Sequence, residues 1–231
     1  MSHKNTLQGI YAISDEILTP YEILSQYVES ALKAGVRIFQ LRDKSHSDEW
    51  LYPIAKELLG LCERYNALFV LNDRLDLALR LNAPVLHIGK DDGEFSRVRE
   101  RFSGILGASS YGDLQKAQIL ESLGADYVAF GAFFPSSTKP NATAAPLELL
   151  PQAQQTLKIP ICAIGGISTQ NIHLLKNADM CAVISSLWSH NTQDSSTLES
   201  TRTNSTHTES TLQNRLDSIT HNAKALQKAL E

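Results

Sequence analysis

Short apolar runs recur along the 231-residue chain, and each is followed by a longer segment whose apolar residues repeat with helical spacing. This alternation is typical of βα units that build a parallel sheet. Eight such units favour an α/β protein that folds as a closed (β/α)8 barrel, or TIM barrel, with a single domain over residues 1–231. The eight predicted strands are Ile10–Ser14, Ile38–Arg42, Leu68–Asn72, Val85–Ile88, Ile105–Ser109, Tyr127–Phe130, Ile161–Ile164 and Cys181–Ser185.

A doubly wound open sheet is the alternative architecture for the same alternation. It would usually carry a glycine-rich G-x-G-x-x-G turn after its first strand, where a dinucleotide pyrophosphate binds. No such turn follows the first predicted strand. The sequence therefore favours the barrel.

The chain changes character between residues 191 and 211. From Thr192 to Thr211, 12 of 20 residues are Ser or Thr, and apolar side chains are almost absent. Such a segment cannot bury enough surface to order itself, so it predicts a disordered, low-complexity insertion. Apolar residues then recur at alternating four- and three-residue steps, which predicts a helix over 212–231 that closes the barrel. A tail that binds a partner is the alternative for this amphipathic helix.

Composition and charge argue against several classes of protein. Hydrophobic residues make up 42% of the chain, and no apolar stretch approaches the roughly 18 residues that span a bilayer. The net charge of −4 argues against broad nucleic-acid binding, so a local cluster would have to hold any anion. The polar segment Met1–Ile10 lacks the apolar core of a signal peptide, which predicts a cytoplasmic protein. The widely spaced Cys62, Cys162 and Cys181 are interpreted as core residues.

The clearest chemical signal is the segment Gln40-Leu41-Arg42-Asp43-Lys44 at the end of the second predicted strand. Alternate side chains of a strand share a face, so we expect Gln40, Arg42 and Lys44 to point the same way. Two fixed cations on one face indicate a site for a polyanion. A solvated strand end is the alternative, because basic residues are common on protein surfaces.

Carboxylates follow the third and fourth predicted strands. Asn72-Asp73 ends the third strand, and Asp91-Asp92 comes shortly after the fourth. Adjacent barrel strands would bring these carboxylates together, and Mg2+ usually bridges one or two carboxylates and the phosphate oxygens of a substrate. The alternative is that they cap the helices that follow. His87, within the fourth strand, is interpreted as a core or supporting residue rather than a general base.

Hydroxyl groups and a further cation follow the fifth and sixth predicted strands. Ser109 ends the fifth strand, where its hydroxyl would face the same cavity. The loop after the sixth strand contains Ser136-Ser137-Thr138-Lys139, which combines hydroxyl donors with one point charge and suits phosphate recognition. A local backbone hydrogen bond of Ser109 and a plain surface turn are the respective alternatives.

A second anion site is predicted after the last two strands. Gly165-Gly166 follows the seventh strand, and Ile184-Ser185 ends the eighth. Barrels of this kind often bind one monophosphate there, through backbone N–H groups and a helix N-terminus. One cationic site suited to diphosphate and one neutral site suited to monophosphate fit a transferase that joins two phosphorylated substrates.

Together these segments resemble the thiamine-phosphate synthase family, also called thiamine-phosphate pyrophosphorylase. The resemblance runs from about Tyr11 to Leu187, and it is the order and spacing of the segments that make it specific. The family-like segments are Gln40-Leu41-Arg42-Asp43-Lys44, Asn72-Asp73, His87-Ile88-Gly89, Gly107-Ala108-Ser109, Ser136-Ser137-Thr138-Lys139 and Ala163-Ile164-Gly165-Gly166-Ile167.

The resemblance implies a (β/α)8 barrel transferase of thiamine biosynthesis. It would transfer the 4-amino-2-methylpyrimidin-5-ylmethyl group from its diphosphate to 4-methyl-5-(2-phosphoethyl)thiazole, giving thiamine phosphate and diphosphate. The family is thought to act by ionisation, in which the diphosphate leaves and the thiazole nitrogen captures the pyrimidine methylene cation. The implied cofactor is Mg2+, and the implied partners are the two small-molecule substrates, with no nucleic acid or membrane. The sequence leaves the oligomeric state open, and a homo-oligomer is compatible with it.

The resemblance also implies a role for each candidate residue. Arg42, Lys44 and Lys139 would be catalytic, because they would stabilise charge on the departing diphosphate. The implied diphosphate site consists of Arg42, Lys44, Asn72, Ser109 and Lys139, and Asp73 and Asp92 would bind Mg2+. Gln40 would contact the pyrimidine, and Ser136 and Thr138 would lie near the thiazole phosphate and the diphosphate. The implied thiazole phosphate site consists of Gly166, Ile184 and Ser185.

Three positions depart from the usual pattern of the family. Ser136 replaces the first Thr of a T-x-T-K loop, Lys90 replaces a Gln and adds a cation near Asp92, and Tyr111 replaces a frequent His.

Two other functions are alternatives to the synthase. A thiazole tautomerase on the same barrel would lack the full set of cations and carboxylates, and a non-catalytic protein would bind thiamine phosphates and regulate a partner through residues 192–211.

Overall fold

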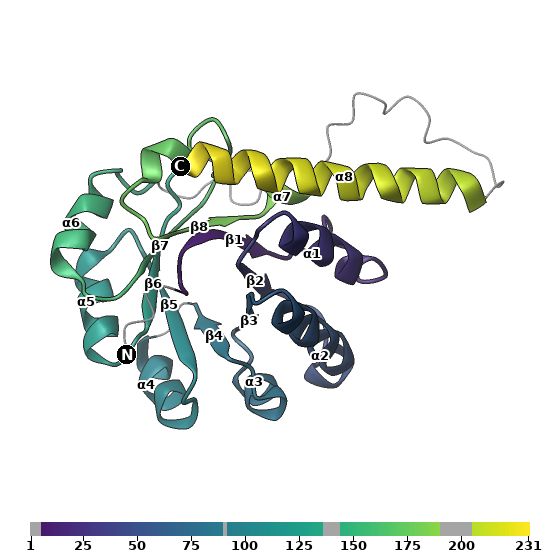
Figure 1. The fold of residues 1–231 in the computed structure, drawn as a ribbon. Helices are drawn as coiled ribbons and strands as arrows, with labels where there is room; N and C mark the ends of the chain where they lie inside the picture. Colours follow the sequence, from purple (N-terminus) through teal and green to yellow (C-terminus); the bar gives the residue numbers. More distant parts are fainter. Residues whose placement is uncertain (1–5, 90–91, 136–143, 190–204) are drawn as a thin grey trace.

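The computed structural model describes residues 6–89, 92–135, 144–189 and 205–231. Eight parallel strands close into a barrel in chain order, which confirms the predicted (β/α)8 architecture (Figure 1). The last strand pairs with the first, with Gly9 opposite Met180, and this pairing excludes the open sheet. The strands are β1 (Gly9–Ile13), β2 (Ile38–Leu41), β3 (Leu68–Asn72), β4 (Val85–Ile88), β5 (Ile105–Tyr111), β6 (Tyr127–Phe130), β7 (Ile161–Ile164) and β8 (Met180–Val183).

The strand bounds agree closely with those predicted from the apolar runs. β3, β4, β6 and β7 have the predicted bounds, and the others differ by one or two residues at one or both ends. β8 ends at Val183 because Ser185 already begins a short helix. β5 continues to Tyr111, and its pairing with β6 shifts register between Ser109 and Tyr111. Such irregularities are common at barrel rims beside active sites.

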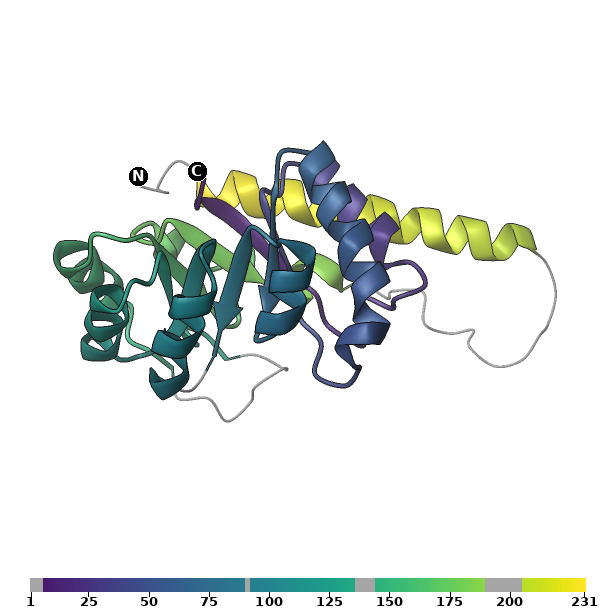
Figure 2. The same ribbon diagram turned by 90° about the horizontal axis from the view of Figure 1, so that it is seen from below.

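The helices form an outer layer around the barrel, as both views show (Figures 1 and 2). The second one begins after Ser47, whose Oγ accepts a hydrogen bond from the Trp50 N–H at 3.3 Å, and acidic residues fill its first turn. None of the helices, within the residues described, is long and apolar enough to cross a membrane. The helices are α1 (Leu24–Lys33), α2 (Asp48–Arg64), α3 (Leu75–Leu81), α4 (Asp92–Arg101), α5 (Leu114–Ser122), α6 (Leu149–Thr156), the 3-10 helix η2 (Ile172–Leu175), α7 (Ser185–Trp188) and α8 (Ser205–Leu230).

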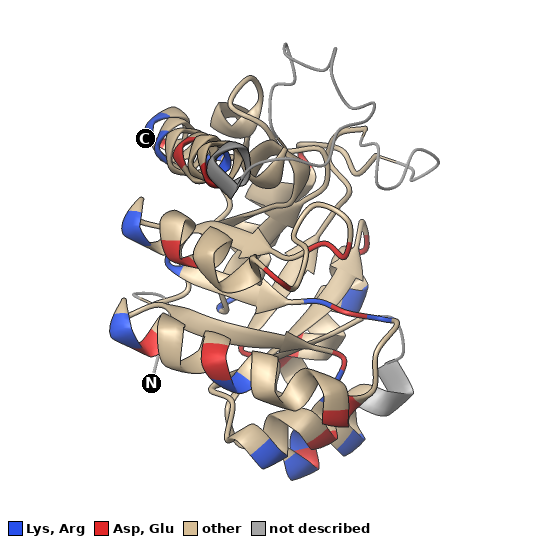
Figure 3. Ribbon diagram, turned by 90° about the vertical axis from the view of Figure 1, so that its right-hand side faces the viewer, with Lys and Arg blue, Asp and Glu red and all other residues tan. Residues whose placement is uncertain are grey.

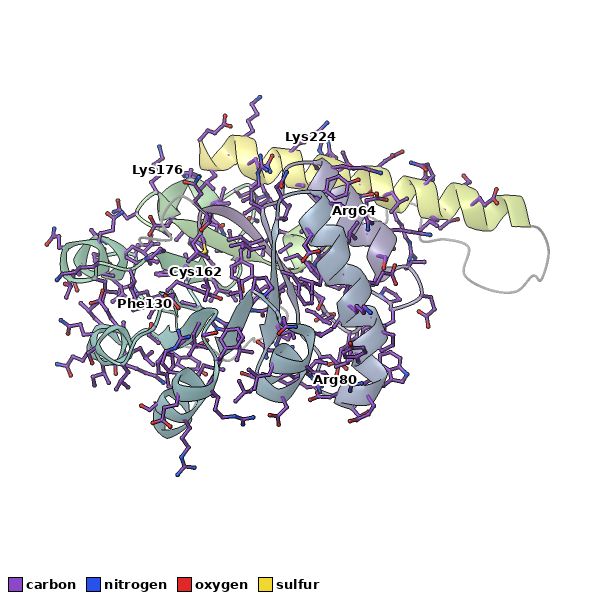
Figure 4. The ribbon with its side chains drawn as sticks, turned by 60° about the horizontal axis from the view of Figure 1, so that its bottom comes forward. Arg64, Arg80, Phe130, Cys162, Lys176 and Lys224 are labelled. Carbon is purple, nitrogen blue, oxygen red and sulfur yellow. The ribbon has the colours of Figure 1, made fainter. Side chains whose placement is uncertain are left out.

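Two apolar clusters fill the molecule, one inside the barrel and one between the strands and the helices. They are separate because successive side chains of a strand point to opposite faces. Cys162 lies in the inner cluster and Cys181 in the outer one, and both are free and buried, as predicted for core residues. Figure 4 places Cys162 and Phe130 among the strands, whereas Arg64 and Lys176 lie on the outer surface.

The barrel interior is tightly packed where β5 and β6 meet. The ring of Tyr127, which is fully buried, lies directly against Gly107. A Cβ atom at position 107 would overlap this ring, well inside van der Waals contact. Glycine is therefore required at position 107 for space, and it allows a large phenol ring to occupy the centre of the barrel.

Helix α8 begins at Ser205 rather than at Leu212. Its Ile219, Ala223 and Leu226 are buried against α1, α7 and β1, while its first turns extend past the barrel (Figure 1). Once the packed turns have formed, each further residue adds one hydrogen bond at little cost, which extends the helix into residues 205–211 of the predicted insertion. Residues 190–204 lie outside the described part of the chain. The division of the chain into one domain with an insertion stays a prediction.

Candidate active site

The candidate site lies at the end of the barrel where the carboxyl ends of the strands meet. Five of the predicted residues, Gln40, Asn72, Ser109, Gly166 and Ser185, lie at or just after these ends, on five different elements or their loops. Most charged residues lie in the loops and on the outer helices, and the barrel strands carry few (Figure 3). A charge cluster at this rim therefore stands out against a nearly uncharged barrel.

Some residues singled out in the sequence lie outside the described part of the chain. Ser136, Thr138 and Lys139 lie outside the described residues, and so does Lys90. Asp92 is the first residue of α4, but its side chain is not described. The geometry of the site therefore rests on the residues of β1 to β5, β7 and α7.

The end of β2 carries the two predicted cations. Gln40 is buried inside the barrel, where its Nε2 donates to the Tyr11 hydroxyl at 2.7 Å. Arg42 is held from β1, because its N–H donates to Ser14 Oγ at 2.8 Å. Within the described part of the chain, neither Arg42 nor Lys44 forms an ion pair. Two cations without carboxylate partners are what a site for a multiply charged anion requires.

Asp43, between these cations, faces the opposite way and is buried. Its carboxylate accepts hydrogen bonds from the Tyr21 hydroxyl at 2.5 Å, from the His46 N–H at 2.8 Å and from Arg74 at 2.8 Å. Arg74 also binds Asp48 at 2.6 Å, at the start of α2. These contacts of Asp43 were not predicted from the sequence. The signal for them was the alternation itself, which places Asp43 on the face away from the cations.

The charge state of Asp43 follows from these contacts. Burial alone would raise its pKa, but hydrogen bonds from Tyr21 and His46 outweigh burial and lower the pKa to about 2. An unfolded aspartate has a pKa of about 3.9. Because the folded pKa is the lower one, this carboxylate stabilises the fold above about pH 4, and the contribution is lost as the pH falls towards about 2.

We expect Asp43→Asn to reduce the free energy of unfolding by about 2 kcal/mol near neutral pH. The difference from the unaltered protein should fall by about half by pH 3, because the unfolded carboxyl, with a pKa of about 3.9, is then mostly protonated while the folded one is still ionised. Urea unfolding of both proteins between about pH 6 and pH 3 measures this. Asp76→Asn, at a carboxylate that is 77% exposed, is the control and should change stability by less than about 0.5 kcal/mol. A difference at Asp43 that does not change with pH would contradict the assignment.

Asp73 follows β3 in a left-handed conformation, with φ of 60°. Its Oδ1 accepts the Gly89 N–H at 2.9 Å, and its Oδ2 accepts Asn72 Nδ2 at 2.7 Å. The residue that precedes α3 is Arg74, and it makes no side-chain cap, so the capping alternative for Asp73 is wrong. Left-handed backbone at a residue other than glycine is strained and clusters at functional sites. Asp73 is thus held at the rim with its carboxylate exposed.

Another group of metal-binding type lies in the loops that follow β1 and β2; the second of these, residues 42–47 between β2 and α2, is called the β2 loop below. Glu16, Asp43 and His46 place one ligand atom each within 4.8 Å of one another. One oxygen of Asp43 is bound by Arg74 and the other by Tyr21. A divalent cation there would lie beside a guanidinium group, so the donor chemistry favours Asp73 over this group as a ligand of Mg2+.

Ser109 of β5 faces the barrel interior and contacts β4. Its Oγ lies 3.0 Å from His87 Nε2, so the alternative of a local backbone bond is wrong. His87 is 8% exposed, and its Nδ1 lies 3.0 Å from the Tyr127 hydroxyl. Burial lowers the pKa of His87 to about 4, and the nearby Asp73 opposes this only in part. His87 is thus a buried supporting residue, as predicted.

The ends of β6 and β7 come into close contact. Gly165 and Gly166 both have positive φ, 103° and 63°, and a Cβ at either position would overlap Ala132 or the main chain of Phe134. The Phe134 N–H donates to the Gly165 oxygen at 3.0 Å. The glycine pair is therefore needed to bring the loop after β6 next to β7. Ser185 begins α7 just after the adjacent strand β8. The N–H groups of Leu187 and Trp188 donate to the Ile184 oxygen at 3.0 and 3.1 Å, which leaves those of Ser185 and Ser186 without an intrahelical partner.

Comparison with known proteins decides the family. The family model described as thiamine monophosphate synthase matches residues 10–187. The chain belongs to this family. It is 50% identical over 186 residues to a thiamine-phosphate synthase of Wolinella succinogenes, covering 79% of this chain and 86% of the relative. It is 42% identical over 187 residues to a thiamine-phosphate synthase of Thioalkalivibrio sulfidiphilus, covering 79% and 89%.

A solved structure extends the likeness to the whole fold. Thiamine phosphate pyrophosphorylase from Pyrococcus furiosus superposes with a TM-score of 0.79 at 30% identity, and the match covers 98% of this chain and 96% of that one. The resemblance found from the sequence is thus confirmed. As a member of the thiamine monophosphate synthase family, the chain is a transferase of thiamine biosynthesis, and the reaction predicted for it is the reaction of this family.

Proposed function

We propose that this chain forms thiamine phosphate at the rim of its barrel, with the pyrimidine diphosphate held between the β2 loop and Asp73. The observation that carries the proposal is the pairing pattern of the β2 loop. Asp43 is buried and fully bound, whereas Arg42 and Lys44 have no ion-pair partner among the described residues. A bound diphosphate would be the anionic partner of these two cationic side chains.

The chemistry asked of the chain is stabilisation of a leaving group. As the bond between the pyrimidine methylene carbon and the diphosphate oxygen breaks, charge builds up on the diphosphate. Arg42, Lys44 and Lys139 would stabilise that charge, and preorganised cations are among the largest contributors to catalysis. Asn72 and Ser109 would add hydrogen bonds. Alignment of the thiazole nitrogen with the methylene carbon then allows capture of the cation.

Asp73 and Asp92 would hold Mg2+, which would supply further positive charge beside the diphosphate. The donors at Asp73 fit this ion. Each of its carboxylate oxygens accepts a single hydrogen bond in the structure, which leaves a lone pair on each for a hard cation. Asp73 is also exposed, so a hydrated ion can reach it.

The two organic substrates would occupy opposite sides of the rim. Gln40 would contact the pyrimidine, since its amide lies inside the barrel on β2, two positions before Arg42. The thiazole phosphate would bind at Gly166, Ile184 and Ser185, which follow the adjacent strands β7 and β8. Ser136 and Thr138 would lie between the two phosphate groups. This arrangement would place the diphosphate and the thiazole phosphate on separate donors.

The buried groups of the barrel interior suit an ionisation mechanism. Burial raises the pKa of Tyr11, Tyr127 and Cys162, and it lowers the pKa of His87 to about 4. All four side chains are therefore neutral near pH 7. A reaction in which the diphosphate leaves before the new bond forms needs no nucleophile or base from the protein. The proposal includes a cytoplasmic location, which the unpaired cysteines support.

The direct test is an assay of the full chain with both substrates. We expect thiamine phosphate, detected by mass spectrometry, when the pyrimidine diphosphate, the thiazole phosphate and Mg2+ are present. Omitting either substrate should abolish the product, and excess chelator should slow its formation by at least about tenfold. Failure to form product although both substrates bind would overturn the proposed function, and product formation unaffected by chelator would overturn the Mg2+ site.

A further inference from the structure

Polar side chains from five strands form one continuous chain of hydrogen bonds across the barrel interior. Gln40 Nε2 lies 2.7 Å from the Tyr11 hydroxyl, which lies 3.1 Å from the Tyr127 hydroxyl. The Tyr127 hydroxyl lies 3.0 Å from His87 Nδ1, and His87 Nε2 lies 3.0 Å from Ser109 Oγ. The two ends of this chain, Gln40 and Ser109, are the residues assigned above to the pyrimidine and to the diphosphate.

This series of hydrogen bonds, called the relay below, has a direction, because each hydroxyl has only one proton to donate. The Gln40 amide nitrogen can only donate, so the Tyr11 oxygen accepts and the Tyr11 proton goes to the Tyr127 oxygen. The Tyr127 proton then goes to His87 Nδ1. The imidazole proton is thereby placed on Nε2, from which it is donated to Ser109 Oγ. The Ser109 proton is left without a partner in the chain and is directed to the rim.

The same hydrogen bonds can also form with every donor and acceptor reversed, and Ser109 then has the opposite role. If the Gln40 amide presented its oxygen to Tyr11, every donor would reverse, and the Ser109 proton would be donated to His87 Nε2. Ser109 would then offer only lone pairs to an anion. A doubly protonated imidazole does not fit the first direction, because the Tyr11 and Tyr127 protons would then face each other. The orientation of one amide on β2 thus decides what a hydroxyl on β5 can do.

We propose that Tyr11, Tyr127 and His87 are positioning residues that transmit the orientation of the Gln40 amide to Ser109 and so fix Ser109 as a hydrogen-bond donor to the diphosphate. The inference rests on the proposed function, since that function places the diphosphate at Ser109. The same orientation points the Gln40 oxygen away from Tyr11, where it can accept from the amino group of the pyrimidine. Recognition of the pyrimidine and stabilisation of the leaving group are thereby linked.

The interior of the barrel suits such a relay. Gln40, Tyr11 and Tyr127 are at most 3% exposed, so water does not compete for their hydrogen bonds. The rings of His87 and Tyr127 stack with centroids 5.5 Å apart, and those of Tyr11 and Tyr127 meet edge to face at 6.4 Å. In a low-dielectric interior, hydrogen bonds in series polarise one another. The part of the relay from Gln40 to Tyr127 is thus held rigidly and away from solvent.

The tautomer of His87 tests the direction without any need for turnover. In protein labelled with 15N in the histidine rings, the His87 signals are those lost in His87→Gln. We expect a neutral ring with its proton on Nε2 in the unaltered protein. In Tyr127→Phe, which removes the donor to Nδ1, we expect a mixture of both tautomers. A wild-type ring with its proton on Nδ1 would overturn the proposal, whatever the activity of the protein.

Steady-state kinetics test whether the relay acts through Ser109. We expect Tyr127→Phe to lower kcat about tenfold, with KM for both substrates changed less than about twofold. In a Ser109→Ala background the same substitution should have almost no further effect, because the acceptor end of the relay is gone. An undiminished tenfold loss in that background would show that Tyr127 acts only by shaping the barrel, which would overturn the proposal.

Two further variants keep the kinetic test decisive. Tyr65→Phe removes a tyrosine hydroxyl that binds Glu29 on the outside of the barrel at 2.8 Å, and it should leave kcat unchanged. If Tyr127→Phe does not fold, Tyr11→Phe interrupts the relay one step earlier and carries the same expectation. If the unaltered protein makes no thiamine phosphate, the proposed function fails, and the tautomer of His87 still reports the direction of the relay.

Discussion

Arg42→Ala is expected to slow formation of thiamine phosphate by about 10³-fold while the barrel remains folded. The side chain has no ion-pair partner among the described residues, so its removal leaves no unpaired charge behind. Its main-chain bond to Ser14 is retained, so the loop keeps its shape. The loss should therefore fall on the leaving diphosphate. The measurement is kcat with both substrates saturating, together with the circular dichroism spectrum as a check on folding.

Arg37→Ala is the matched control for this substitution. Arg37 is an exposed arginine that immediately precedes β2, so it lies at the opposite end of the strand that leads to Arg42. Its removal changes the net charge by the same amount, and we expect kcat to stay within about twofold of the unaltered protein. Equal losses in the two variants would mean that overall charge, rather than the rim site, governs the rate. Near-normal turnover of Arg42→Ala would remove the diphosphate from the β2 loop.

Asp73→Asn is expected to raise the Mg2+ concentration needed for half-maximal rate by at least about tenfold and to lower kcat by about 10²-fold. The amide keeps the size of the side chain and one oxygen, but it loses the negative charge that attracts the cation. The measurement is the rate as a function of Mg2+ concentration at fixed, saturating substrates. A Mg2+ requirement identical to that of the unaltered protein would exclude Asp73 as a ligand.

Asp76→Asn provides the comparison for Asp73. Asp76 lies three positions further along the chain on α3, where it binds Arg101 on the surface at 2.7 Å. The substitution is chemically the same and removes the same charge from the same part of the chain. We expect its Mg2+ dependence to match that of the unaltered protein. The pair of variants thereby separates a local ligand effect from a general loss of negative charge near the rim.

The strands were predictable because each carries a local signal. A buried parallel strand needs a short apolar run, and β3, β4, β6 and β7 match such runs from end to end. The rim residues were predictable for the same reason. Gln40 and Asp73 come at strand ends, and the carboxyl ends of parallel strands share one end of a barrel.

The contacts that support the site were not predictable in this way, because they join distant parts of the chain. Tyr11 and Tyr127 are 116 positions apart, and Asp43 and Arg74 are 31 apart. Apolar periodicity indicates which face a residue occupies but not which residue it meets there. Only closure of the barrel brings β1 and β6 residues to a common centre. The start of α8 was placed too late for a different reason, since Ser and Thr favour a helix weakly and leave little signal in the sequence.

The alternation at the end of β2 restricts the length of that loop. Arg42 and Lys44 are free of ion pairs among the described residues, while Asp43 between them is buried against Arg74. Insertion or deletion of one residue before Asp43 would exchange these faces. A carboxylate would then approach the diphosphate, and a cation would be forced against the Arg74 guanidinium. Surface loops usually tolerate changes in length, but this one can change only in steps of two residues.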